Sequence, residues 1–168
     1  MTPRHVFLVG MMGVGKTTVG RLLARRLGRP YFDSDEQVRA HTGKTVPEIF
    51  ETEGEAAFRA EEKRALAEAV ACAAPAVVSV AGGAVLDPDN RTLLQARGTV
   101  VWLRATVETM ALRVGRGEDR PLLEGDPAEA LARLYPQRAP VYEELADVVV
   151  DVDDTLPPQV VDKIVAAL

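Results

Sequence analysis

The feature that most constrains the fold of this 168-residue chain is the segment 10–17, which reads GMMGVGKT. It follows the apolar run 5–9 and precedes a helical pattern that extends to Leu27. A G-x-x-x-x-G-K-[ST] segment between a strand and a helix is typical of a phosphate-binding loop. Its glycines allow a tight turn in which several backbone N–H groups point at one phosphate, and the helix N-terminus adds a positive dipole end. We therefore expect Lys16 to reach the β- and γ-phosphates of a nucleotide and Thr17 to offer its hydroxyl to Mg²⁺.

Strand-like and helix-like segments alternate along the rest of the chain. Short apolar runs predict strands, and periodic segments bounded by capping residues predict helices. The strands are expected at 31–32, 76–81, 99–103 and 148–152, and the helices at 18–27, 35–41, 45–50, 55–73, 87–97, 106–112, from 126 onward and 157–168. Pro136 and Pro140 are expected to kink or break the helix that Asp126 caps. The alternation predicts one α/β domain, with a parallel sheet covered by helices on both faces in three layers.

The composition excludes several classes of protein. The net charge of −5 argues against a general nucleic-acid or membrane surface, which would need a dominant basic face. No apolar run approaches the ~18 residues of a membrane span, and we expect a cytoplasmic location. The single cysteine, Cys72, cannot form an internal disulfide, and we expect it to be a small buried apolar residue.

Two carboxylates, Asp33 and Asp35, follow the second expected strand. In open parallel sheets, ligands bind beyond the carboxyl ends of the strands, so the phosphate loop, these two residues and Gly82-Gly83 should converge on one crevice. One carboxylate could hold Mg²⁺ through its water shell while the other orients a substrate hydroxyl for in-line attack. The alternative is that Ser34-Asp35 only caps the next helix.

Three arginines are not expected to serve only the i,i+4 ion pairs that are usual on helix surfaces: Arg59, Arg120 and Arg138. The planar guanidinium matches a carboxylate or a phosphate with two parallel hydrogen bonds. Arg120 follows a glycine-rich, non-periodic stretch, and such a loop could close over the γ-phosphate and exclude water. We therefore predict a mobile lid at about 113–125.

Taken together, the motifs of this sequence resemble those of the shikimate kinase family over nearly the whole chain. The motifs that carry the resemblance are 10–20 (GMMGVGKTTVG), Asp33-Ser34-Asp35, Ile49-Phe50 with Glu53-Gly54-Glu55, Phe58-Arg59-x-x-Glu62, Gly82-Gly83-Ala84-Val85, Arg120-Pro121-Leu122-Leu123 and Arg138-Ala139-Pro140-Val141-Tyr142. The resemblance implies a monomeric P-loop kinase related to nucleoside monophosphate kinases, with a substrate-binding helical segment at about 33–62 and no nucleic-acid or membrane partner. The implied reaction transfers the ATP γ-phosphate to the 3-hydroxyl of shikimate, a step of chorismate and aromatic amino acid biosynthesis.

The resemblance also implies a role for individual residues. Asp35 would contact the substrate hydroxyl as base or orienting group. The shikimate carboxylate would be held by Arg59 and Arg138, with the backbone of Gly82 and Gly83 against the ring. ATP would be bound by Gly13, Val14, Gly15, Lys16, Thr17, Thr18, Arg113 and Arg120, of which Lys16 and Arg120 stabilise the phosphoryl group and Arg113 lies against adenine. Thr17 would ligate Mg²⁺ and Asp33 would hold it through water.

The chain departs from the family pattern at two places. Ala81 stands where the family usually has the first of three glycines, and the segment 153–157 is acidic where basic or polar residues are common in the adenine loop. Two other readings stay open at the level of sequence. One is a gluconate or nucleoside monophosphate kinase of the same fold, and the other is a regulatory module that binds nucleotide without catalysis. The second is disfavoured by the presence of Asp35, Arg59 and Arg120.

Overall fold

A computed structural model describes residues 4–114 and 125–168 of the chain. Its centre is a sheet of five strands in the order β2-β3-β1-β4-β5, and every neighbouring pair is parallel. The strands are β1 (His5–Val9), β2 (Tyr31–Asp33), β3 (Val77–Ser79), β4 (Gly98–Arg104) and β5 (Val148–Asp151). The parallel sheet predicted from the alternating pattern is confirmed.

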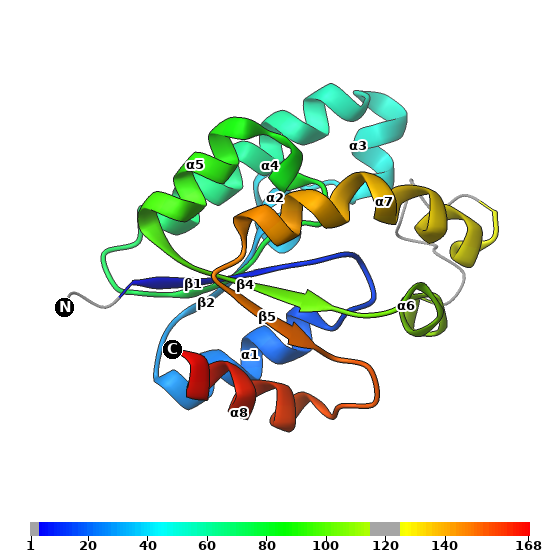
Figure 1. The fold of residues 1–168 in the computed structure, drawn as a ribbon. Coiled ribbons are helices and arrows are strands. Elements are labelled where there is room, and N and C mark those ends of the chain that lie inside the picture. The colour runs from blue at the N-terminus through cyan, green and yellow to red at the C-terminus, as the bar shows by residue number, and fades with distance from the viewer. Residues whose placement is uncertain (1–3, 115–124) are drawn as a thin grey trace.

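Helices cover the sheet on both faces, which gives the three layers that the sequence predicts (Figure 1). In Figure 1, α1 and α8 lie on one side of the sheet, and α4, α5 and α7 lie on the other. The helices are α1 (Lys16–Leu27), α2 (Ser34–Thr42), α3 (Val46–Thr52), α4 (Glu55–Val70), α5 (Pro88–Arg97), α6 (Val107–Val114), α7 (Pro127–Leu145) and α8 (Pro157–Ala167), with a short 3₁₀ turn, η1 (Ala84–Leu86). None of the helices in the described parts of the chain is long and apolar enough to cross a membrane.

The main hydrophobic core is built around strands that are buried on both faces. All five residues of β1 and all three of β3 are buried, and the apolar residues of β4 pack beside them. Strands of this kind read as continuous apolar runs, which is why the sequence places them correctly. Because the strands are all parallel, the loops after β1, β2 and β3 leave the sheet at the same edge. The strand order also requires the connection from β3 to β4 to pass over β1.

A second, smaller core holds the helices that follow β2. Val38, Ile49, Phe58 and Ala65 form a separate buried cluster that joins α2, α3 and α4. The Thr45 side chain accepts from the Glu48 N–H, and Glu48 binds the Thr45 N–H in return, so the predicted capping box is present. This cluster makes the region from α2 to α4 a packed unit beside the main sheet.

Three sequence expectations need correction. The helix α7 runs through Pro136 and Pro140 without a break, because its buried face, which includes Leu131, Tyr142 and Leu145, holds it against the rest of the protein. The helix α4 ends at Val70 rather than near 73. Cys72 therefore lies in the turn that follows and is partly exposed rather than buried. Local rules describe residues one turn away, whereas the continuity of α7 depends on packing against distant parts of the chain.

Candidate active site

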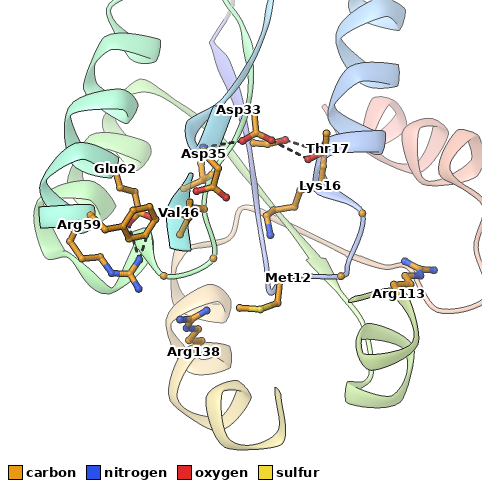
Figure 2. A pocket seen from close by; sticks show the side chains of 18 of the residues that line it. Met12, Lys16, Thr17, Asp33, Asp35, Val46, Arg59, Glu62, Arg113 and Arg138 are labelled. Atoms are coloured by element: carbon orange, nitrogen blue, oxygen red, sulfur yellow. Dashed lines mark hydrogen bonds and ion pairs between the residues drawn. The ribbon is translucent and has the colours of Figure 1, made fainter. Parts of the chain in front are cut away.

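A cleft of about 400 Å³ opens at the carboxyl edge of the sheet (Figure 2). The predicted convergence is confirmed, since the loops after β1, β2 and β3 all contribute to it. Its lining consists of Met12, Gly13, Gly15, Lys16, Thr17, Thr18, Asp33, Asp35, Val46, Phe50, Phe58, Arg59, Glu62, Ser79, Val80, Ala81, Gly82, Gly83, Arg113 and Arg138. One end of the cleft is the phosphate loop, and the other is formed by α2, α3, α4 and α7.

The phosphate loop has a shape that only glycine permits at two positions. Gly10 has φ +143° and Gly13 has φ +84°, and a Cβ at either would lie under 3 Å from a backbone oxygen of β4 or α6. Inside the loop, Lys16 Nζ donates to the carbonyl oxygens of Gly10 and Met11, at 2.7 and 3.0 Å. The ammonium group thus lies over the loop, at the place where phosphate oxygens would take over its hydrogen bonds.

Asp33 links the phosphate loop to the helix that follows β2. The Thr17 hydroxyl donates to Asp33 Oδ2 at 3.0 Å, while Asp33 Oδ1 accepts from the N–H groups of Asp35 and Glu36 at 3.0 and 3.2 Å. The cap of α2 is therefore Asp33 and not Ser34-Asp35 as the alternative proposed, and the cap uses only one carboxylate oxygen. The second oxygen faces the cleft side of α1.

The pair Thr17 and Asp33 has the chemistry that Mg²⁺ needs. The Thr17 hydroxyl donates its hydrogen bond to Asp33, so the lone pairs of the hydroxyl oxygen are available to a cation. The Asp33 carboxylate adds negative charge next to that oxygen. Mg²⁺ keeps several waters and takes one or two protein oxygens plus phosphate oxygens in such sites. The described residues contain no cluster of three or more His, Cys, Asp or Glu side chains that could hold a metal ion.

At the other end of the cleft, Asp35, Arg59 and Arg138 come from α2, α4 and α7 and border the same space (Figure 2). Arg138 is only 3% exposed, and its Nε has no hydrogen-bond partner among the described residues. A buried guanidinium with an unused donor is costly unless an anion binds it. The geometry therefore provides an acid-binding group beside a carboxylate.

Arg59 is held by a buried acid that the sequence reasoning did not assign. Its Nη1 lies 3.0 and 3.2 Å from the two oxygens of Glu62, whose side chain is 1% exposed. Burial raises the pKa of Glu62 to about 7, and the positive charge of Arg59 opposes part of that rise. A signal was present, because the motif Phe58-Arg59-x-x-Glu62 places the two charges three residues apart on one helix.

The glycines after β3 let this arginine lie close to the backbone. A Cβ at Gly83 would be 2.6 Å from both Nη atoms of Arg59, and one at Gly82 would be 3.2 Å from Arg138 Nη1. The Tyr142 hydroxyl donates to the Gly82 carbonyl oxygen and fixes this loop from α7. Tyr142 was also not assigned from the sequence, although it lies one helical turn after Arg138. Ala81 is accommodated, with its methyl at the wall of the cleft and its N–H donating to Ser34 Oγ at 2.9 Å.

Arg113 lies near the phosphate loop and away from Arg59 (Figure 2). Its guanidinium donates to the carbonyl oxygens of Val14 and Val152, at 3.3 and 3.4 Å. The nearby Asp153 accepts from the N–H and the hydroxyl of Thr106, whose side chain in turn accepts from the Thr109 N–H and caps α6. Arg120 and most of the predicted lid at 113–125 lie outside the described residues.

Comparison with known sequences identifies the family of this chain. A family model described as shikimate kinase matches residues 12–168. A shikimate kinase of Thiobacillus denitrificans is 48% identical over 148 residues, which cover 88% of this chain and 80% of the relative. The chain belongs to the shikimate kinase family. The resemblance inferred from the motifs is thus confirmed.

Solved structures of other proteins share the fold of this chain. The shikimate kinase from Acinetobacter baumannii in complex with shikimate superposes with a TM-score of 0.93 at 41% identity, over 98% of this chain and 92% of that one. A gluconokinase from Sinorhizobium meliloti reaches a TM-score of 0.59 at 19% identity, over 98% and 91% of the two chains. This second likeness shows a shared fold only. The P-loop kinase fold predicted from the sequence is confirmed.

Proposed function

We propose that the chain transfers the γ-phosphoryl group of ATP to the 3-hydroxyl of shikimate. The observation that carries this proposal is the cleft itself, which has a phosphate loop with Lys16 at one end and Asp35 with two arginines at the other. A hydroxylated acid needs a hydrogen-bond acceptor for its hydroxyl and cations for its carboxylate. Membership of the shikimate kinase family and the likeness to a relative solved with shikimate support the same substrate.

The acid end of the cleft would fix the acceptor. Arg59 and Arg138 bind the carboxylate of the substrate, and the backbone at Gly82 and Gly83 lies against the ring. Asp35 then accepts a hydrogen bond from the 3-hydroxyl, orients it, and takes its proton as the new bond to the γ-phosphorus forms. The bond from that phosphorus to the β,γ-bridging oxygen breaks at the same time, and ADP leaves. The apolar side chains of Val46, Phe50 and Phe58 line this end and exclude water from the acceptor.

The loop end would fix the donor. Backbone N–H groups of residues Gly13 to Thr18 surround the phosphates, and Lys16 exchanges its carbonyl partners for phosphate oxygens. Thr17 would hold Mg²⁺ directly and Asp33 would hold it through water, and the ion would supply positive charge next to the transferring phosphate. Arg113 lies against adenine. Arg120, which is assigned from the sequence alone, adds positive charge at the γ-phosphate from a lid at about 113–125.

The setting of the enzyme belongs to the same proposal. We infer one domain, with the phosphate loop at 10–17 and the substrate-binding segment at about 33–62. This domain acts as a cytoplasmic monomer whose partners are ATP and shikimate, without nucleic acid or membrane. The packed unit formed by α2, α3 and α4 supports a distinct segment in this part of the chain.

A coupled ADP-release assay tests this function. The assay runs with ATP and Mg²⁺, and shikimate, gluconate, AMP and CMP serve as acceptors in parallel reactions. We expect turnover with shikimate alone. Turnover with another acceptor would retain the phosphate site but overturn the substrate, and turnover with none would favour a regulatory nucleotide-binding module.

A further inference from the structure

Tyr31 lies where β2, β3 and α1 meet, and its hydroxyl contacts two polar groups. It is 2.8 Å from Ser79 Oγ and 3.3 Å from Asp33 Oδ2. Ser79 Oγ also lies 3.0 Å from the carbonyl oxygen of Lys16. Each hydroxyl has one proton, so when Tyr31 donates to Asp33 Oδ2, Ser79 donates to the Tyr31 oxygen and orients that hydroxyl toward the carboxylate.

The aromatic ring of Tyr31 packs closely against Gly20 in the middle of α1. A Cβ at Gly20 would lie 2.5 Å from Tyr31 Cε2 and 2.8 Å from Ser79 Oγ. Glycine in a helix interior lowers helix stability relative to alanine, so its presence needs a packing reason. That reason is the space taken by Tyr31 and Ser79. The position of the hydroxyl is therefore set by close packing and not by the hydrogen bonds alone.

The contact matters because of how Asp33 is held. Its Oδ1 is fixed by the two N–H groups of α2, but a carboxylate held at one oxygen can still swing the other. Oδ2 receives hydrogen bonds from the Thr17 hydroxyl and from Tyr31. Thr17 lies in the first turn of α1, and its hydroxyl is itself a group that would meet the ion. Tyr31 is anchored in the sheet, so it supplies a fixed reference for Oδ2.

We propose that Tyr31 is a positioning residue for the magnesium pair. Its hydroxyl holds Asp33 Oδ2 in line with Thr17, so that both oxygens face the ion together. The inference rests on the proposed function, in which Thr17 and Asp33 hold Mg²⁺. Groups that orient metal ligands in this way commonly change metal affinity when they are removed.

The test is the variant Tyr31→Phe, which removes the hydroxyl and keeps the ring against Gly20. ADP binding is measured by calorimetry in EDTA and across a Mg²⁺ titration, so that no turnover is needed. We expect the Mg²⁺ concentration for the half-maximal gain in ADP affinity to rise about tenfold. ADP affinity in EDTA should equal that of the wild type, since the phosphate loop is unchanged.

A matched control is Tyr135→Phe, which removes a hydroxyl that makes no hydrogen bond within the described residues and does not line the cleft. It should leave the Mg²⁺ dependence unchanged. If Tyr31→Phe lowers only the melting temperature and keeps the wild-type Mg²⁺ dependence, the tyrosine is merely structural and the inference is wrong. If the wild type itself shows no Mg²⁺ dependence, the proposed magnesium pair fails and the role of Tyr31 fails with it.

Discussion

Arg59 Nη1 lies within hydrogen-bond distance of both carboxylate oxygens of Glu62, and the acid is almost completely buried. The ion pair holds the partly exposed guanidinium in one direction, while the buried carboxylate loses its hydration. The result is a cation fixed at the cleft by an acid whose pKa is raised. Both the geometry of substrate binding and the pH dependence of stability follow from this relationship.

The first prediction concerns pH. Burial raises the pKa of Glu62 from 4.5 to about 7, although Arg59 and Arg138 oppose the rise and Asp35 adds to it. Between these values the folded state keeps a proton that the unfolded state loses, so the free energy of unfolding falls as pH rises through this window. The fall is roughly 3 kcal/mol and is complete above the folded pKa.

Urea unfolding of wild type and Glu62→Gln at pH 4.5, 6 and 7.5 measures this effect. The glutamine is neutral in both states, so the difference in stability between the two proteins should shift in favour of the variant as pH rises. Glu51→Gln, a change at an exposed residue of α3, is the control and should follow the wild type. Parallel curves for wild type and Glu62→Gln would show that the buried acid titrates normally.

The second prediction concerns Asp35. Replacing its carboxylate with an amide in Asp35→Asn removes the acceptor for the hydroxyl proton but leaves the phosphate loop intact. We expect kcat to fall by about 10²- to 10⁴-fold, with ATP affinity unchanged. Steady-state kinetics and ATP calorimetry check the two parts. An unchanged kcat would remove Asp35 from the mechanism.

The third prediction concerns Arg138. The variant Arg138→Met keeps the buried stem and removes the charge that the substrate carboxylate would meet. A charge-assisted hydrogen bond contributes about 1.5–3 kcal/mol, so KM for shikimate should rise by roughly 10- to 150-fold. KM for ATP should stay near the wild-type value. Arg25→Met, on the exposed side of α1, is the control, and an equal rise of both KM values in Arg138→Met would indicate general damage to the cleft.

The fourth prediction concerns the packing of Gly20 against Tyr31. Alanine is the better helix former by about 1 kcal/mol, yet the added Cβ of Gly20→Ala would overlap the ring and Ser79. We expect a net loss of about 1–3 kcal/mol in the free energy of unfolding. In a Tyr31→Ala background, where the ring is absent, the same substitution should cost less. An equal cost in both backgrounds would mean that the ring is not what excludes alanine.

The sequence predicted the elements whose causes are local. The buried strands read as apolar runs, and the box at Thr45 and Glu48 marked the start of α3. The order of strands and loops also predicted that the phosphate loop, 33–35 and 82–83 would meet, because parallel strands end at one edge. The topology of the sheet was therefore enough to predict which segments form most of the candidate site.

The parts that were not predicted depend on contacts between distant segments. Tyr31 and Ser79 are 48 positions apart, and nothing near either residue indicates their hydrogen bond. The burial of Glu62 is set by the fold around α4, so the motif could show its spacing from Arg59 but not its raised pKa. The continuity of α7 across two prolines likewise depends on its packed face.

The most direct test of the central claim is the identity of the product. Wild-type protein is incubated with ATP, Mg²⁺ and shikimate, and the product is examined by proton-coupled phosphorus NMR. The account predicts one new phosphate ester whose phosphorus couples to the proton on carbon 3 of the ring. A phosphate on another hydroxyl would contradict the placement of the 3-hydroxyl at Asp35, and no ester at all would contradict the proposed reaction.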